Sequence, residues 1–442
     1  MTILNIFIII YTKFLIYILK LLGKKAGTYP GKIALRLNKN IRDYFKIEGK
    51  IICVTGTNGK TTTTNMITEI LEKSNKKVVS NKEGNNIGWG ITTTLIKNCS
   101  LTGKIKCDYL VLETDEHWVP VIYSKSNIKL DTLIVLNFFR DQLDRAGEIE
   151  TIVLKLEKFI DKNKCKLILN GDDPNVVRLG LKNNKKDNYY YGMNELPSSY
   201  KISYDKMEGI FCPKCKIELE YNYYQYSHIG SFHCPKCGYG KNKLTTKLTK
   251  IENNKFIVNN KEYITNNNNL YNIYNLLSII TLANIYNLDK TIVNEVFENF
   301  QVKNGRHQRF NINGNECILN LGKNPTGFNV VLRSIKGTNE NKDLLIVLND
   351  NINDGKDVSW IWDIDFKNMQ KFKRIICTGK RAYDLAVTIK CFGYDEKQIL
   401  VNENIESAIN ILLETKNKKY LISNYSPLIQ TKEYLEKLER GK

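Results

Sequence analysis

The chain has 442 residues, of which 42% are hydrophobic and 25% are charged. This is the ordinary balance of a globular protein with room for about three domains, and it excludes a disordered or collagen-like chain. The net charge of +20 favours anionic partners such as nucleotides, nucleic acid or lipid headgroups, although abundant Lys, Asn, Ile and Tyr are also typical of an AT-rich genome. Of the 11 cysteines, seven lack the spacing of a disulfide framework, which indicates a reducing compartment, the cytoplasm.

Residues 1–22, MTILNIFIIIYTKFLIYILKLL, form the one membrane-like segment. Basic residues do not come first and no small-residue cleavage site follows, so a secretory signal is excluded. Lys13 interrupts the roughly 20 apolar residues that a full span needs. We expect a helix lying on the inner leaflet, with KLLGKK as its cationic anchor. A transmembrane anchor and a helix packed on the protein's own core are the alternatives for this segment, which belongs to a predicted N-terminal region, residues 1–49.

From Lys50 the pattern becomes strand, loop and helix: KIICVTG, TNGK, TTTTNMITEILEKSN. Further strands are predicted at 109–114, 131–137 and 166–170, with helical stretches between them. Strands that alternate with helices at this spacing predict a mostly parallel α/β sheet. We therefore expect an α/β domain over residues 50–300.

The stretch TGTNGKTTTTN (55–65) is the strongest local signal for chemistry. A Gly-rich turn between a strand and a helix lets backbone N–H groups surround phosphates at the helix N-terminus. Lys60 would reach the β- and γ-phosphates and the Thr61 hydroxyl would bind Mg²⁺. Val54 stands where the strict Walker pattern has a small residue, so the loop is a variant form. The nucleotide-binding candidates are Gly56, Thr57, Asn58, Gly59, Lys60, Thr61 and Thr62.

Polar segments also follow the later strands, where parallel sheets place the ligand crevice. LETDEH (112–117) closes one strand with acids, and Glu113 is the expected second Mg²⁺ ligand. NFFRDQLDRAGE (137–148) leaves the next strand, and we interpret LNGDDP (169–174) as ordinary turn chemistry.

Two CPKC pairs, separated by 18 residues, interrupt the α/β pattern inside an insert of about 203–247. Each pair fits a tight knuckle, and four thiolates close a tetrahedron around Zn²⁺. Four protein ligands leave no open position, so the zinc would be structural. The predicted ligands are Cys212, Cys215, Cys234 and Cys237.

Residues 301–442 restart the strand–helix alternation and predict a second, smaller α/β domain. Its strand 343–350 leads into LNDNINDGKDVSWIWDIDF (348–366), where five aspartates surround two of the four tryptophans. A metal site, a catalytic acid cluster and a docking surface are the three interpretations. The metal site is the weakest, because no His or Cys lies near.

These segments resemble the Mur ligase superfamily, the ATP-dependent enzymes that build peptidoglycan stem peptides. TGTNGKTTT matches their phosphate loop, and NFFRDQLDRAGE is similar to their N…DHLDR…GE segment, with Gln142 in place of His. YNIYN (271–275) and NGRHQRF (304–310) resemble the central HN…N helix and the interdomain hinge. The resemblance implies that Asn272 contacts the nucleotide and that Arg306 reaches phosphate.

The cysteine insert, KNPTGFN (323–329) and DGKDVSWIWDIDF are similar to the MurT ligases, subunits of lipid II isoglutaminyl synthase. This resemblance implies a carbon–nitrogen ligase of peptidoglycan biosynthesis that uses ATP, Mg²⁺ and structural Zn²⁺. It would phosphorylate the α-carboxylate of D-glutamate in lipid II and amidate it with ammonia from a GatD-type glutaminase, its heterodimer partner. Lys323 and Asn324 would face the substrate.

The residues support a separate ammonia source. A triad glutaminase needs a cysteine on a G-x-C-x-G elbow with a histidine, and none of the 11 cysteines lies in such an elbow. By resemblance, the DGKD segment faces the glutaminase and an aspartate orients its catalytic histidine. Asp357 is the first candidate and Asp354 the second. Trp360 and Trp362 are either anchors of that surface or core of the small domain.

Three other functions remain as alternatives. A Mur- or folylpolyglutamate-type ligase adding an amino acid would need no partner; Gln142 and the DGKD segment argue against it. A nucleic-acid-binding ATPase would need a basic face that the ribbon lacks. A membrane-tethered scaffold would have no turnover. We therefore expect a cytoplasmic enzyme, at or near the inner face of the plasma membrane, that does not bind nucleic acid.

Overall fold

A computed structural model describes residues 2–24, 26–82, 85–124, 126–140, 149–202, 208–300, 308–335, 341–351, 354–366 and 372–441. The chain divides into two compact units. The first comprises Met1–Phe139 and Ile149–Phe300, and the second comprises Arg140–Glu148 and Gln301–Lys442. The Gln142 and Arg306 predictions lie outside the described residues.

The first unit is built on a nine-stranded sheet of order β13-β12-β11-β8-β7-β6-β2-β5-β3. From β3 to β11 all neighbours are parallel, while β11, β12 and β13 pair antiparallel. The central strands are almost wholly buried, because helices cover both faces of a parallel sheet. The strands are β2 (Lys50–Thr55), β3 (Val78–Ser80), β5 (Tyr109–Glu113), β6 (Thr132–Val135), β7 (Lys166–Asn170), β8 (Asn188–Met193), β11 (Thr246–Glu252), β12 (Lys255–Val258) and β13 (Lys261–Ile264).

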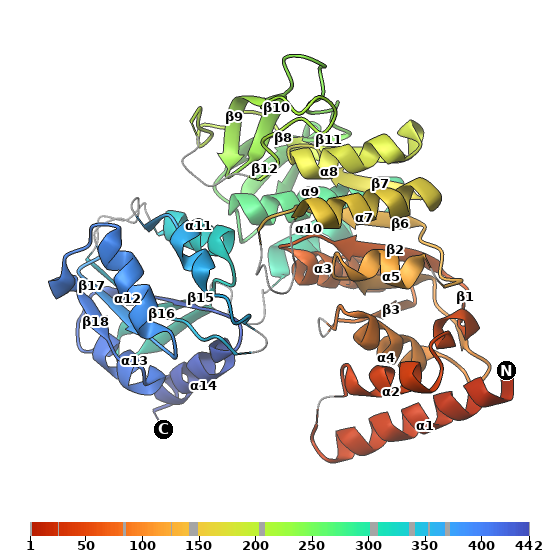
Figure 1. Ribbon diagram of the computed structural model, residues 1–442, viewed down its shortest axis with the longest axis horizontal. Helices are drawn as coiled ribbons and strands as arrows, with labels where there is room; N and C mark the ends of the chain where they lie inside the picture. Colours follow the sequence, from red (N-terminus) through yellow and green to blue (C-terminus); the bar gives the residue numbers. More distant parts are fainter. Residues whose placement is uncertain are drawn as a thin grey trace. The chain divides into compact units, whose positions relative to one another are not determined.

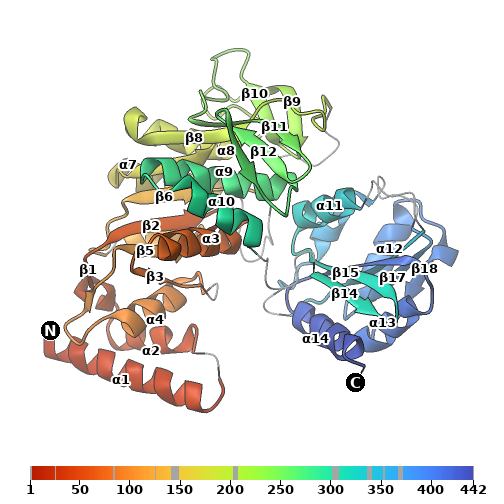
Figure 2. The same cartoon turned by 180° about the vertical axis from the view of Figure 1, so that it is seen from behind.

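Helices cover this sheet on both faces (Figures 1 and 2). α3, α9 and α10 pack on one another along one face, and α5, α7 and α8 lie on the other. The parallel α/β arrangement predicted from the strand spacing is confirmed. The helices are α3 (Lys60–Lys73), α4 (Gly88–Asn98), α5 (Trp118–Tyr123), α7 (Ile149–Lys162), α8 (Pro174–Leu179), α9 (Leu270–Ile285) and α10 (Lys290–Asn299); a short pair, β1 (Lys46–Ile47) and β4 (Lys104–Ile105), lies outside the sheet.

The N-terminal segment is one helix, α1 (Thr2–Leu21), which runs beside α2 (Tyr29–Leu37) and α4 (Figure 1). Its inner face buries Ile8, Ile9 and Ile16, and the Lys13 ammonium donates to the Cys99 carbonyl. The helix is long and apolar enough, over Ile3–Leu21, to cross a membrane by length and composition. It nevertheless packs one face on its own unit, as the third interpretation of this segment proposed.

The cysteine insert lies between β8 and β11 and contains the hairpin β9 (Glu220–Tyr226) and β10 (Ile229–His233). The hairpin pairs antiparallel, and one CPKC pair lies at each of its open ends. The insert therefore belongs to the connection between two adjacent parallel strands, and its hairpin forms a two-stranded sheet of its own beside the main sheet (Figure 1).

The second unit has a six-stranded sheet of order β14-β15-β19-β16-β17-β18, parallel except for β14 and β15. Apolar clusters cover both of its faces. Trp360 belongs to one cluster, whereas 46% of Trp362 is exposed. The elements are β14 (Gln308–Ile312), β15 (Asn315–Leu321), β16 (Lys342–Val347), β17 (Arg374–Thr378), β18 (Ile399–Val401), β19 (Lys418–Ser423), α11 (Pro325–Ser334), α12 (Ala382–Cys391), α13 (Ile405–Leu413) and α14 (Pro427–Glu439).

Candidate active site and zinc centre

The predicted phosphate loop joins β2 to α3. Gly56 and Gly59 have φ angles of 127° and 91°, a region that favours glycine. A Cβ atom added to Gly59 would lie 2.2 Å from the Asn275 Oδ1 atom of α9. The loop is therefore tightly covered by α9 and leads directly into the N-terminus of α3.

The segment that follows β6 braces this loop. The Asn58 N–H donates to Asn137 Oδ1 at 2.9 Å, and the Asn137 amide donates back to the Asn58 carbonyl at 3.1 Å. The Thr57 N–H donates to the Asn137 carbonyl at 2.9 Å, and the Phe139 N–H donates to Thr57 Oγ1 at 3.0 Å. Sequence reasoning placed residues 137–148 in the crevice but did not assign this bracing role to Asn137.

Lys60 begins α3 and is buried. Its Nζ atom lies 3.0 Å from Glu116 Oε2 and also donates to the carbonyls of Gly56 and Thr57. Burial lowers the pKa of Lys60, but the carboxylates of Glu116, Asp115 and Glu113 raise it by more, so the pKa lies above its ordinary value. The loop therefore carries a charged ammonium beside three acids.

Glu113, the predicted Mg²⁺ ligand, ends β5 and is buried. Its Oε1 atom accepts from the Asn86 amide at 2.8 Å, while its backbone N–H donates to Asn81 Oδ1 at 2.9 Å. These contacts fix the carboxylate at the same strand end as Glu116. Sequence reasoning missed Glu116, although LETDEH contains it. Thr61 lies half-buried in the first turn of α3.

Helix α9 presents two asparagines three residues apart. Asn272, the predicted nucleotide contact, donates to the Asn267 carbonyl at 2.7 Å. Asn275 lies against Gly59 instead. The YNIYN spacing contained both residues, but only the three-dimensional structure shows which one reaches the loop.

In the second unit, Asn324 caps α11, accepting from the Gly327 N–H at 2.8 Å. Its amide nitrogen is buried and has no hydrogen-bond partner within the described part of the chain. Lys323 lies beside it, half-buried.

The two candidate aspartates of the DGKD segment differ in their exposure to solvent and in their hydrogen-bond partners. Asp354 is 1% exposed and accepts from the backbone N–H and the hydroxyl of Ser426, the residue that precedes α14. Asp357 is half-exposed, and the Ser359 hydroxyl and N–H lower the pKa of its carboxyl group. Asp357 also lines a groove of about 480 Å³ with Lys356, Trp362, Arg381, Tyr383 and Asp384.

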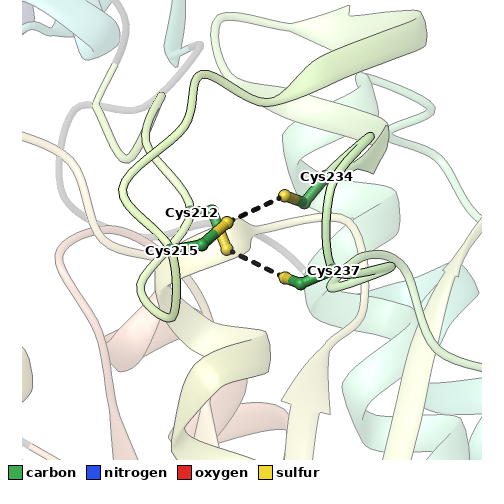
Figure 3. A group of neighbouring side chains, drawn as sticks. All are labelled: Cys212, Cys215, Cys234 and Cys237. Carbon is green, nitrogen blue, oxygen red and sulfur yellow. Dashed lines mark hydrogen bonds between the residues drawn. The ribbon is translucent and has the colours of Figure 1, made fainter.

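The four cysteines of the insert converge (Figure 3). Their sulfur atoms all lie within 4.8 Å of one another, with Cys212 Sγ 3.5 Å from Cys237 Sγ and Cys215 Sγ 3.3 Å from Cys234 Sγ. Each knuckle turns the same way: the Lys216 N–H donates to the Cys212 carbonyl and the Gly238 N–H to the Cys234 carbonyl. Thiolates around Zn²⁺ lie roughly 3.8 Å apart, given Zn–S bonds of about 2.3 Å. The predicted cluster of four cysteines is confirmed, and its donor set and spacing suit Zn²⁺.

Comparisons with known proteins agree with this geometry. The Mur ligase middle domain model matches residues 54–233, and the MurT ligase C-terminal model matches residues 321–428. A pseudomurein peptide ligase type C from Methanothermus fervidus superposes with a TM-score of 0.70 at 22% identity, covering 93% of this chain and 85% of that one. MurF ligase from Thermotoga maritima, solved in complex with ADP, gives a TM-score of 0.58 at 14% identity, covering 93% and 85%. The fold is thus that of a Mur ligase.

A relative that is similar over almost its whole length shows the family of this chain within the Mur ligases. The lipid II isoglutaminyl synthase (glutamine-hydrolyzing) subunit MurT of Staphylococcus aureus (strain COL) is 33% identical over 428 residues, covering 95% of each chain. This chain belongs to the MurT family.

Proposed function

We propose that the chain is an ATP-dependent amide ligase that converts the α-carboxylate of D-glutamate in lipid II to the amide of D-isoglutamine. The observation that carries the proposal is the buried Lys60 ammonium, set in a phosphate loop beside Glu113, Asp115 and Glu116. Family membership supplies the substrate, because the S. aureus relative is named for lipid II.

The chemistry follows from this arrangement. A substrate carboxylate oxygen attacks the γ-phosphorus of ATP, which releases ADP and leaves an acyl phosphate. Ammonia then adds to the acyl carbon, loses a proton and expels phosphate, which leaves the amide. Lys60 and the loop N–H groups offset the negative charge on the transferred phosphoryl group in a site where Asn137 and Asn275 hold the loop in place.

Two metal ions belong to this proposal. Thr61 and Glu113 would hold Mg²⁺, which neutralises phosphate charge when bound. The oxygen donors suit that hard cation, and Asn86 orients the Glu113 carboxylate. Zn²⁺ on the four cysteines would be structural, since four thiolates leave no open position.

The proposal also includes further contacts with the nucleotide and the substrate. Asn272 and Arg306 are proposed nucleotide contacts on the family resemblance. Asn324 is a proposed substrate contact, supported by its buried amide nitrogen, which has no partner among the described residues. Lys323 would supply a neighbouring positive charge.

The ammonia would come from a GatD-type glutaminase in a heterodimer with this chain. The partner surface is the groove around Asp357, where exposed Trp362 and Tyr383 offer aromatic anchors between charged residues. Asp357, whose carboxylate is accessible and held ionised, would orient the partner's catalytic histidine. The buried Asp354 instead has a structural partner in Ser426, which supports the first of the two candidates.

A cytoplasmic chain acting on a lipid-linked substrate needs to reach the inner leaflet, and α1 offers the contact. Its outer face exposes an apolar stripe at helical spacing, Ile3, Phe7, Ile10, Phe14, Tyr17 and Leu21. No acidic residue precedes Asp43, whereas Lys20 and Lys24 flank Leu21 at the C-terminal end of the stripe. An apolar face with basic flanks is typical of a helix lying in an anionic membrane surface.

The direct test is amidation of purified lipid II by the purified chain, followed by mass spectrometry. With ATP and ammonium chloride we expect the mass change of one carboxylate becoming an amide. Glutamine should replace ammonium only when the glutaminase subunit is added. Addition of an amino acid instead of ammonia, or no product with any amine, would contradict the proposal.

A further inference from the structure

The turn of the hairpin in the cysteine insert packs against Phe139, which belongs to the segment that braces the phosphate loop. Its turn carries His228, which is fully buried and whose ring centroid lies 4.8 Å from that of Phe139, at 51° between planes. Tyr226, at the end of β9, stacks on the same phenylalanine at 5.9 Å. Among the described residues neither ring nitrogen of His228 makes a hydrogen bond, although Nε2 lies 3.6 Å from Asp173 Oδ2. The ring therefore contacts Phe139 by packing and also lies beside the Asp173 carboxylate.

Phe139 belongs to the segment that braces the loop. Its N–H donates to Thr57 Oγ1, and Asn137, two residues earlier, makes paired hydrogen bonds with Asn58. From the other direction, the Phe138 N–H donates to Asp173 Oδ2 at 2.9 Å. Residues 137–139 are thus held between the phosphate loop and the region of the hairpin turn.

The opposite ends of the hairpin strands are where the cysteines lie. Cys212 and Cys215 precede β9, and Cys234 and Cys237 follow β10. An isolated two-stranded hairpin is marginally stable, so a metal that joins its two open ends would stiffen it. The Gly230 N–H also donates to the Asp172 carbonyl at 2.9 Å, which fastens β10 to the loop after β7.

We propose that zinc binding at the four cysteines is thermodynamically coupled to nucleotide binding at the phosphate loop, with His228 as the positioning residue that connects them. Zinc fixes the hairpin, the hairpin turn packs on Phe139, and the Phe139 segment holds the loop in its phosphate-binding conformation. The inference rests on the proposed nucleotide site. Because coupling between two binding equilibria is reciprocal, nucleotide must then tighten zinc binding by the factor by which zinc tightens nucleotide binding.

The experiment measures the zinc affinity of the full-length chain by competition with a chromogenic chelator, without nucleotide and with a saturating non-hydrolysable ATP analogue and Mg²⁺. We expect nucleotide to tighten zinc binding by about fivefold or more. A parallel calorimetric titration of the analogue into zinc-loaded and zinc-free chain should give the same factor.

Three variants test whether His228 connects the zinc site to the phosphate loop. His228→Ala keeps all four cysteines and should still bind one zinc, with an affinity that nucleotide no longer changes. His228→Phe keeps the ring packing and should retain the coupling. Asn222→Ala, at an exposed position on the same hairpin, is the matched control and should behave like the unaltered chain.

Each contrary result has a separate meaning. If the analogue binds but zinc affinity does not change, the coupling is wrong and the nucleotide site stands. If the analogue does not bind the zinc-loaded chain, the proposed function fails and the coupling fails with it. Full coupling in His228→Ala, or its loss in His228→Phe, would overturn the assignment of ring packing as the connection.

Discussion

Lys60 and Glu116 form an ion pair inside the proposed nucleotide site, with Nζ 3.0 Å from Oε2 and less than a tenth of either residue exposed. A buried charge whose partner is removed is strongly destabilising, whereas loss of both charges costs much less. The pair therefore allows the proposed catalytic role of Lys60 to be separated from its structural role.

We expect Lys60→Met to lower kcat by at least about 100-fold, because a charge aimed at the transferred phosphoryl group is lost. The same variant should also lose stability, since Glu116 is left buried without its ammonium. In the double variant Lys60→Met with Glu116→Gln, part of the stability should return while turnover stays absent. Thermal unfolding and phosphate release would measure the two effects, and a double variant that recovers turnover would contradict the assignment of Lys60.

Gly59→Ala should weaken nucleotide binding. Its φ of 91° is strained for any residue with a Cβ, and that atom would lie 2.2 Å from Asn275 Oδ1. Strain of about 1–3 kcal/mol at this turn corresponds to roughly a 5- to 150-fold loss of affinity. Isothermal titration calorimetry with an ATP analogue measures this loss of affinity. Gly393→Ala, at an open turn of the second unit, is the control and should leave nucleotide affinity unchanged.

The two aspartates of the DGKD segment should give opposite phenotypes. Asp354→Asn weakens the buried contacts with Ser426 and should destabilise the chain by about 1–3 kcal/mol. Asp357→Asn should leave the melting temperature unchanged. In the complex with the glutaminase it should suppress glutamine-driven amidation and spare ammonium-driven amidation. Suppression by Asp354→Asn alone would transfer the partner role to that residue.

Zinc loss should be visible without any activity measurement. Elemental analysis should find one zinc per chain, and Cys212→Ser should lose it and lower the melting temperature by about 5 °C or more. Cys391→Ser, which removes an exposed cysteine from the second unit, should change neither. A zinc-free chain with four intact cysteines would contradict the ribbon assignment.

The outer face of α1 should bind anionic vesicles. Phe7 and Phe14 are both exposed on that face. Replacing both with Asp should weaken sedimentation with vesicles containing phosphatidylglycerol by at least about tenfold, since each buried Phe contributes about 1.5–3 kcal/mol. Leu181→Asp, at an exposed position elsewhere in the first unit, is the control. Equal binding by all three chains would contradict the membrane contact.

The order of strands and helices could be predicted because apolar runs of strand length alternate with helical periodicity, and the phosphate loop because its glycines and Lys60 are contiguous. The CPKC pairs likewise encode their own local geometry. Glu116, Asn137 and Asn275 could not be assigned in the same way. Each contacts a partner that is distant in sequence. Only the packing of β5, β6 and α9 around the phosphate loop determines which side chain lies against it. Asp354 shows the same limit, because its partner Ser426 is 72 residues away.

The central claim is that the substrate carboxylate is activated as an acyl phosphate. Lipid II labelled with ¹⁸O in the α-carboxylate of D-glutamate tests it most directly, with ATP and ammonium chloride as co-substrates and mass analysis of the phosphate released. We expect one ¹⁸O atom in the phosphate for each amide formed, because the oxygen that attacks ATP leaves with the phosphoryl group. Unlabelled phosphate, with amide formed, would contradict the mechanism.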